Sequence, residues 1–276
     1  MKYGVYLLSS MLCLASCTSS EPLPVAHERK YRLSEYTSVE LQESFVEAGV
    51  PTISTQNTYI YTDGLLRERV FHQQSKSATA PFELKEQTYV TYADRMVTID
   101  NGREAIQYVL NDEGFALSAE RMGGEQRRTY RFAYTEAGRL TCVTEMIDGV
   151  LFSQCDIVYK DNVTAEMKTT MQGHTQSFRL TFEPENIRMI PNRIPILFGV
   201  ERYPLSVHET AFYANLLGAH SPTLLKEVSP LDSEDSTGKV SYTYIMTTQG
   251  EISMLTETTN SHGNQYTRSV SYTLKR

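Results

Sequence analysis

The sequence predicts an all-β protein: an antiparallel up-and-down meander, rolled or barrel-like, with one helical or irregular insertion near residues 186–230. Apolar and polar residues alternate over most of the chain, as in the run Tyr130-Arg131-Phe132-Ala133-Tyr134. This alternation is typical of strands with one buried face and one wet face. Short turns that contain glycine separate the alternating runs, which favours a meander of hairpins.

Five turns fit the template of a two-residue hairpin, in which glycine supplies the left-handed backbone. They are Thr62-Asp63-Gly64-Leu65, Asp100-Asn101-Gly102-Arg103, Met122-Gly123-Gly124-Glu125, Ile147-Asp148-Gly149-Val150 and Ser261-His262-Gly263-Asn264. Each of them predicts a pair of adjacent antiparallel strands. Residues 34–48, which precede the first turn, are compatible with either a helix or a first strand.

Residues 186–230 break the alternation and are rich in proline and leucine. Within them, Ser206 and Glu209 have the spacing of a capping box, which predicts a helix with Ser206 as its N-cap and Gly218 at its end. Much of the surface of this helix is apolar. We therefore expect the segment to cover or plug the buried face of the sheet.

The N-terminus has the parts of a secretory signal: the charged Lys2, an apolar run, and the small-residue stretch Leu14-Ala15-Ser16-Cys17. The run is too short to span a bilayer. It resembles bacterial lipoprotein signals, which implies cleavage before Cys17 and acylation of that residue. The alternative is an ordinary signal peptide with a chance cysteine.

This resemblance divides the chain into a signal peptide (1–16), a lipidated flexible tether (17–30) and a single β-meander domain (31–276). The expected location is the cell envelope, with an anchor in the lipid of the outer membrane through Cys17. Removal of the signal takes away Lys2, one of 26 basic residues, and leaves 33 acidic residues and a net charge of −8. Such an acidic chain is not expected to bind nucleic acid.

Two cysteines remain after lipidation, and they flank the turn at Asp148-Gly149. Counting outward from this turn places Cys142 opposite Cys155 at a non-hydrogen-bonded position, where Cα atoms lie about 4.5 Å apart. A disulfide tolerates about 4.4–6.8 Å, and the envelope is oxidising. The spacing predicts a disulfide between Cys142 and Cys155. The alternative is two reduced cysteines on one face of the sheet.

The sequence contains no motif that indicates catalysis. The six histidines lack the spacing of metal ligands, and we expect them at the surface or in turns. His208-Glu209 begins like a zinc-protease motif, but Phe212 stands where the second histidine is required. We therefore expect no catalytic residue, no metal and no cofactor, and the chain is not expected to be an enzyme.

A weak repeat runs through the strands: Tyr-x-Tyr, a turn, glycine, a charged residue, and then leucine or isoleucine. It occurs at residues 134–140, at 242–252 and, with a longer turn, at 108–115. This pattern resembles uncharacterised lipoproteins of Bacteroidetes-type bacteria, whose meanders use hairpins also seen in YD-repeat proteins. The resemblance covers roughly residues 57–274. It implies a rolled or porin-like sheet, and it carries no assigned activity and no functional residues.

Three classes of function remain open at this point. The first is a non-catalytic envelope lipoprotein, structural or partner-binding, whose partner is an unknown envelope protein. The second is a carrier of a hydrophobic ligand, such as a lipid or acyl chain, held between the sheet and its helical cover. The third is a glycan-binding accessory lipoprotein. An integral outer-membrane barrel is not expected, because the second face of the strands carries Thr, Ser, Arg and Lys.

Overall fold

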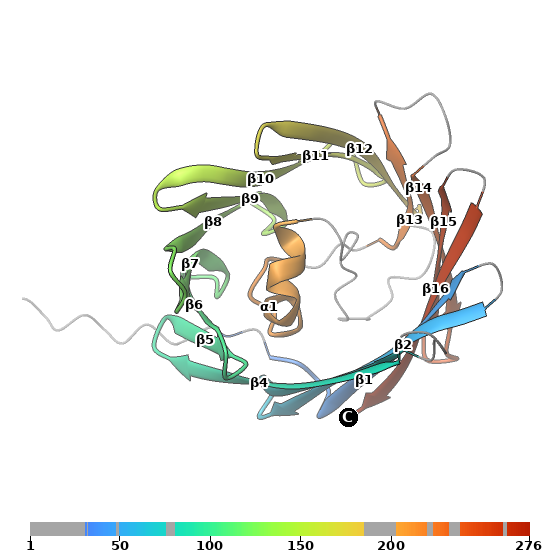
Figure 1. The fold of residues 1–276 in the computed structure, drawn as a ribbon, viewed down its shortest axis with the longest axis horizontal. Coiled ribbons are helices and arrows are strands. Elements are labelled where there is room, and N and C mark those ends of the chain that lie inside the picture. Colours follow the sequence, from blue (N-terminus) through green and yellow to red (C-terminus); the bar gives the residue numbers. More distant parts are fainter. Residues whose placement is uncertain are drawn as a thin grey trace, which may run out of the picture.

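The chain forms a closed antiparallel barrel of sixteen strands (Figure 1). The computed structural model describes residues 31, 33–47, 50–75, 81–184, 203–219, 223–231, 238–261 and 264–276. The predicted fold class, an all-β meander with a barrel-like sheet, is therefore confirmed. Among the residues described, no helix has the length and apolarity needed to cross a membrane.

The strands follow one another around the barrel in sequence order. The first eight are β1 Ser38–Glu47, β2 Val50–Thr62, β3 Leu65–Ser75, β4 Phe82–Ala93, β5 Met96–Asp100, β6 Ala105–Leu110, β7 Ala116–Met122 and β8 Arg128–Tyr134. The second eight are β9 Leu140–Ile147, β10 Val150–Tyr159, β11 Thr164–Met171, β12 His174–Phe182, β13 Leu225–Pro230, β14 Lys239–Met246, β15 Ile252–Ser261 and β16 Asn264–Lys275.

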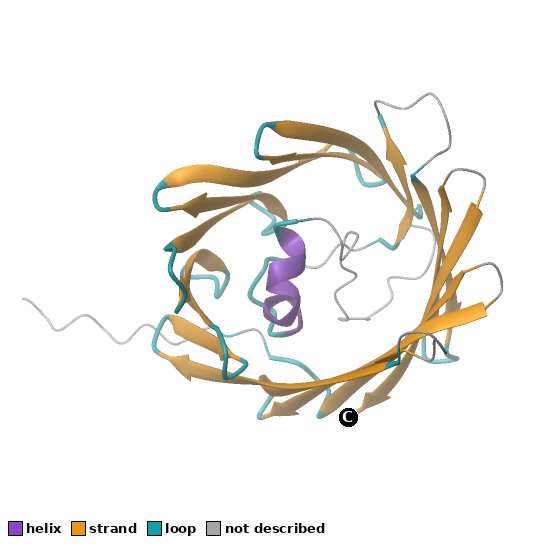
Figure 2. Cartoon of the chain, in the orientation of Figure 1, coloured by secondary structure: helices purple, strands orange, loops and turns teal. Residues whose placement is uncertain are grey.

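The barrel closes where the first strand meets the last. β1 pairs with β16 in an antiparallel register in which Val39 lies opposite Leu274. Figure 2 shows the strands as a ring with the short helix inside it. Residues 34–48, for which the sequence left a helix or a strand open, thus supply the closing strand. Closure removes the two exposed edges that an open sheet of this size would present to other chains.

The hairpin turns predicted from Asp-Gly pairs lie where the sequence placed them. β2 ends at Thr62 and β3 begins at Leu65, and the turn residues Asp63 and Gly64 have φ of 52° and 73°. Both values are left-handed, as a two-residue hairpin of the primed type requires. Hairpins also lie at Asp100 and Met122, but their loops are longer than the predicted two residues, because β6 begins at Ala105 and β8 at Arg128. The predicted turn at residues 262–263 lies outside the described residues.

The interior of the barrel is an aromatic and aliphatic core. The inward side chains include the fully buried rings of Tyr59, Tyr108 and Tyr130. Tyr130 and Phe132 share this buried face, as the alternation predicted. The large number of tyrosines is therefore mainly a property of the inner face of the sheet, where a ring can be buried while its hydroxyl finds a polar partner.

Part of the predicted insertion lies inside the ring of strands (Figure 1). It consists of a 3-10 turn, η1 (Leu205–His208), followed by a single turn of α-helix, α1 (Glu209–Tyr213). The predicted capping box is wrong, because Ser206 lies within η1 and Pro204 precedes it without a side-chain capping bond. The helix also ends at Tyr213, before Gly218. Residues 186–202 lie outside the described residues.

Candidate functional site

Residues 203–219, called the plug below, attach to the inner wall of the barrel through stacked aromatic rings. The ring of Tyr213 stacks on that of Tyr59, with the centroids 3.7 Å apart and the planes inclined by 18°. The hydroxyl of Tyr61 donates a hydrogen bond of 3.0 Å to the backbone carbonyl of Tyr213. The C-terminal end of α1 is therefore held by two inward tyrosines of β2.

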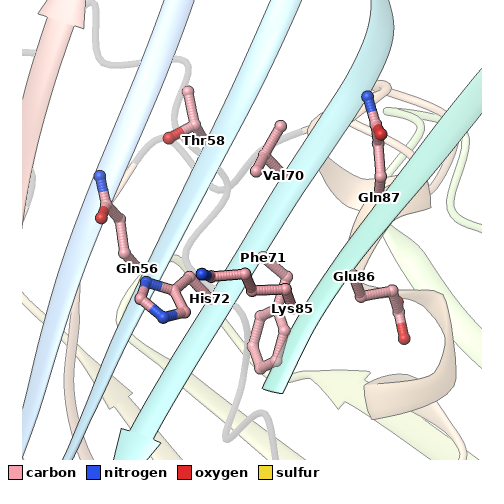
Figure 3. A pocket seen from close by; sticks show the side chains of 8 residues that line it. All are labelled: Gln56, Thr58, Val70, Phe71, His72, Lys85, Glu86 and Gln87. Atoms are coloured by element: carbon pink, nitrogen blue, oxygen red, sulfur yellow. The ribbon is translucent and has the colours of Figure 1, made fainter. Parts of the chain in front are cut away.

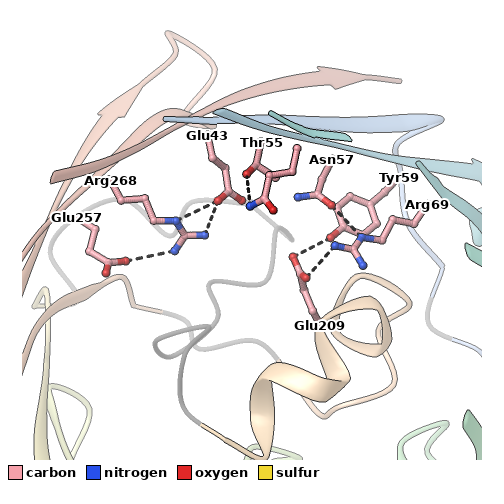
Figure 4. A network of polar contacts seen from close by, with 9 residues as sticks. Glu43, Thr55, Asn57, Tyr59, Arg69, Glu209, Glu257 and Arg268 are labelled. Carbon is pink, nitrogen blue, oxygen red and sulfur yellow. Dashed lines mark hydrogen bonds and ion pairs between the residues drawn. The ribbon is translucent and has the colours of Figure 1, made fainter. Parts of the chain in front are cut away.

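A charged contact holds the other end of α1 (Figure 4). The Glu209 carboxylate accepts a hydrogen bond from the Tyr59 hydroxyl and another from Nη2 of Arg69, both at 3.1 Å. Nε of Arg69 donates to the side-chain oxygen of Asn57 at 2.9 Å. Burial raises the pKa of the Tyr59 hydroxyl well above its ordinary value, so Tyr59 stays protonated and remains a donor.

His208 is fully buried against the inner wall at β6 and β8, in an aromatic enclosure. Its Nδ1 is 2.8 Å from the hydroxyl of Tyr108, and its ring contacts those of Tyr130 and Phe132 edge-on at 4.5 and 5.1 Å. Burial lowers the pKa of the imidazole to about 3. The prediction that each histidine lies at the surface or in a turn is therefore wrong for His208, which is a neutral core residue.

A buried carboxylate sits beside this enclosure. Glu145 is fully buried and accepts hydrogen bonds from Nη1 of Arg128 at 3.0 Å, from the Tyr130 hydroxyl at 3.2 Å and from Oγ of Ser153 at 2.9 Å. Arg128 also contacts the hydroxyl of Tyr203, at the start of the plug. The Glu145 carboxylate thus links β8, β9 and β10, and Arg128 extends these hydrogen bonds to the plug.

The far end of the plug joins the wall through its backbone. Ala116 donates its N–H to the carbonyl of Leu216 at 2.7 Å, and Ala219 donates to the carbonyl of Gly138 at 2.7 Å. Gly218 has a φ of +91° and no room for a side chain, because a Cβ there would lie 2.6 Å from the carbonyl oxygen of Gly138. The plug is thus bonded to the wall at both ends.

A second charged network lies on the inner wall near β1, β15 and β16 (Figure 4). Arg268 donates to the Glu43 carboxylate through Nε and Nη2, at 3.1 and 2.9 Å, and Nη1 lies 3.4 Å from the Glu257 carboxylate. Burial raises the pKa of Glu43 even though Arg268 opposes that shift. These residues occupy inward strand positions, where alternation predicts apolar side chains, so sequence reasoning missed them.

The outer wall of the barrel is polar over much of its circumference. The outward positions of β11 are Thr164, Glu166, Lys168 and Thr170, and their partners on β12 are Thr181, Arg179, Ser177 and Thr175. Large apolar side chains are also exposed, among them Met96, Val109, Leu117 and Val158. Glu120 and Arg131 lie on the outer face of the same part of the wall. On these strands, charged residues therefore lie among the exposed apolar ones.

A groove of about 520 Å³ lies on the outer wall across β2, β3 and β4 (Figure 3). Its residues are Gln56, Thr58, Val70, Phe71, His72, Lys85, Glu86 and Gln87. The register places six of them on the outer face, whereas Phe71 and Glu86 belong to the alternate, inward set. The groove is therefore a feature of the external surface and is separated from the plug by the sheet.

The register that was predicted to place Cys142 opposite Cys155 is wrong. A bulge at Phe152 shifts the register, so that Cys155 lies opposite Val143 and Cys142 lies opposite Asp156. Successive positions on a strand point to opposite faces, and Cys155 accordingly faces the core while Cys142 is half-buried on the outer side. Neither cysteine forms a disulfide within the described part of the chain. Cys17, the predicted lipidation site, lies outside the described residues.

A family model and one solved structure agree with this architecture. Residues 28–254 match the model of a domain of unknown function (DUF4595) with porin-like fold. A crystal structure of a porin-like protein from Bacteroides uniformis ATCC 8492 is 28% identical, with a TM-score of 0.78 over 89% of this chain and 100% of that one. A second porin-like protein, from Bacteroides vulgatus ATCC 8482, is 13% identical over 86% of this chain and 98% of its own, with a TM-score of 0.28. The search of curated proteins finds no match.

Proposed function

Because this chain belongs to the family of domains of unknown function with a porin-like fold (DUF4595), we propose that it is a non-catalytic, lipid-anchored protein of the cell envelope. In this proposal the outer wall of the barrel is surrounded by water and binds a partner. The porin-like fold is compatible with an envelope location. The lipoprotein-like signal that ends at Cys17 supports an anchor made of acyl chains instead of a barrel embedded in lipid.

The observation that carries this proposal is the polarity of the outer wall. A strand that faces lipid carries an apolar residue at every second position, and each Lys or Arg near the bilayer midplane costs about 2–4 kcal/mol. The middle of β11 instead presents Glu166 and Lys168, with Arg179 opposite Glu166 on β12. A wall of this composition is stable in water and is disfavoured in a hydrocarbon layer.

The plug supports the same proposal from the inside. It is bonded to the wall at both ends, and its side chains at Leu205, His208, Ala211 and Leu216 are at most 3% exposed. A carrier of a lipid or acyl chain needs apolar side chains that its ligand can reach, and these side chains of the plug are buried by contacts within the protein. The described interior therefore favours partner binding on the outside over storage of a hydrophobic ligand.

The experiment that tests the proposal follows the full chain in a bacterial host that processes lipoproteins. The wild-type protein is expected to incorporate an azide-tagged palmitate and to remain in the membrane pellet. Cys17→Ala, with residues 1–16 replaced by a conventional cleavable signal peptide, should lose the label and appear in the soluble fraction with its barrel folded. Cys142→Ala is the matched control and should keep both label and membrane association. A Cys17→Ala protein that stays in the pellet through an alkaline carbonate wash would show that the barrel itself is inserted, which contradicts the proposal.

A further inference from the structure

The groove on β2–β4 contains pairs of amide and carboxylate side chains that are already ordered. Nε2 of Gln56 donates to Glu40 at 2.7 Å, and Nε2 of Gln87 donates to Glu68 at 2.5 Å. An amide both donates and accepts, whereas a carboxylate only accepts. Each pair therefore offers a donor and several acceptors at a fixed spacing, which suits a ligand whose hydroxyl groups can both donate and accept.

The charges beside the groove compensate one another. Glu83 lies 2.8 Å from Nε2 of His72 and 2.9 Å from Nζ of Lys85. The hydrogen bonds from Lys85 and His72 lower the pKa of Glu83 to about 2, so the carboxylate stays ionised opposite them. Lys85 is thus already paired, and the carboxylates of Glu40 and Glu68 repel an anion. The groove therefore disfavours an anionic ligand, whereas a neutral ligand meets no such repulsion.

An exposed aromatic ring continues this surface. Tyr89 is 52% exposed and lies opposite Glu68 in the register, on the outer face that also carries Gln87. Gln87 and Tyr89 are two positions apart on β4, so their Cα atoms lie about 6.8 Å apart. Val70, which is 39% exposed, adds an apolar patch in the groove beside Gln87, its partner in the register.

We propose that this outer surface of β2–β4 binds a neutral oligosaccharide. A pyranose ring has an apolar face, which can stack on the ring of Tyr89, and an edge of hydroxyl groups, which can bond to the Gln87–Glu68 and Gln56–Glu40 pairs. The volume of about 520 Å³ lies in the range of small-ligand sites. The inference rests on the proposed function, because it requires that this part of the wall faces water.

The test titrates the full chain, purified in lauryldimethylamine oxide, a detergent without a sugar headgroup. The probes are maltohexaose, xylohexaose and N-acetylchitohexaose, and polygalacturonate of similar length is the anionic comparison. We expect at least one neutral probe to bind, and Tyr89→Ala and Gln87→Leu each to weaken that binding at least tenfold. Tyr89→Phe, which keeps the ring, should bind within about threefold of the wild type.

Tyr266→Ala on β16 is the matched control, because Tyr266 is also an exposed tyrosine (36%) and lies outside the groove. Its binding should not change. The inference is overturned if none of the three neutral probes binds, if Tyr89→Ala binds as well as the wild type, or if polygalacturonate binds more tightly than they do. A protein that passes the Cys17→Ala release experiment and fails this titration would retain the proposed function and lose only the oligosaccharide site.

Discussion

Tyr213 of the plug and Tyr59 of β2 are stacked face to face at 3.7 Å, and both rings are buried. The stack joins a short segment, which could not be stable alone, to the rigid wall of the barrel. One turn of α-helix has too few internal hydrogen bonds to offset the entropy of ordering it. The position of α1 therefore depends on the contacts that its side chains make with β2 and β3.

Removing the ring of Tyr213 should therefore destabilise the protein and loosen the plug. We expect Tyr213→Ala to lower the free energy of unfolding by about 3–5 kcal/mol, the usual cost of deleting a buried aromatic ring. Urea titration followed by fluorescence measures the loss, and limited proteolysis should show earlier cleavage within 203–219. Tyr266→Ala, at an exposed ring, should cost less than about 1 kcal/mol. Equal losses in the two variants would contradict the stacking argument.

The pairing of Arg268 with Glu43 predicts an asymmetry between single and double variants. Arg268→Leu leaves the buried Glu43 carboxylate, which is 6% exposed, without its two hydrogen bonds, and should cost about 3–5 kcal/mol. The double variant that adds Glu43→Gln removes the buried charge and should recover part of this loss. Thermal unfolding of the four proteins of the cycle gives the coupling energy.

The control for this cycle is an exposed ion pair. Arg95 pairs with Asp112 on the surface, where the two side chains are 55% and 81% exposed. Arg95→Leu should change the stability by less than about 1 kcal/mol, because water screens such pairs. A coupling energy near zero for Glu43 and Arg268 would indicate that the inner network does not stabilise the barrel.

His208 should make the stability of the protein depend on pH. Its pKa is lowered to about 3 in the folded state and stands near 6.5 in the unfolded chain, so only the unfolded state takes up this proton as the pH falls below 6.5. The stability that the neutral His208 contributes is fully present above pH 6.5 and is lost as the pH falls toward 3. Between pH 7.5 and 5, we expect His208 to account for a loss of about 2 kcal/mol.

The pH effect is isolated by comparing two variants. His208→Phe removes the titrating group and should flatten this part of the stability curve, whatever its own cost at pH 7.5. His174→Asn alters an exposed histidine at the start of β12 and should leave the slope unchanged. Urea midpoints measured at intervals of half a pH unit are sufficient. If His208→Phe keeps the pH dependence of the wild type, that dependence comes from other titrating groups and not from His208.

The thiols provide a direct test of the corrected register. In the processed protein, which lacks Cys13 and whose Cys17 is acylated, maleimide treatment without reduction should place one label on the half-buried Cys142, while Cys155, which is 1% exposed, should react only after unfolding. No loss of two hydrogens should appear in the intact mass. Cys142→Ala should abolish the native label. An intact mass two units below that of the reduced chain, with no label after unfolding, would show that Cys142 and Cys155 form a disulfide.

A feature of this fold can be predicted from the sequence when its signal is local. Asp148-Gly149 specifies its own turn, because the two positive φ values depend on those two residues alone. The register beyond the turn also depends on the bulge at Phe152, which the alternation of apolar and polar residues does not reveal. For this reason the sequence placed Cys142 opposite Cys155, and the structure does not. His208 and Glu145 are polar residues that only the assembled barrel buries, so no local pattern could assign them to the core.

Gly218 offers the sharpest test of how closely the plug approaches the wall. In Gly218→Ala, the new Cβ would lie 2.6 Å from the carbonyl oxygen of Gly138 and 3.0 Å from the ring of Tyr134. Gly123 has a similar φ, +88° against +91°, but nothing lies within 4 Å of the Cβ position. Gly123→Ala should therefore show only the cost of a left-handed alanine, about 1–2 kcal/mol. Gly218→Ala should lose clearly more, because the plug must also move away from the wall. Urea unfolding compares the two, and hydrogen exchange at Ala219, whose N–H bonds to Gly138, should accelerate only in Gly218→Ala. If the two alanine variants lose equal stability, the close contact between plug and wall is not present in solution.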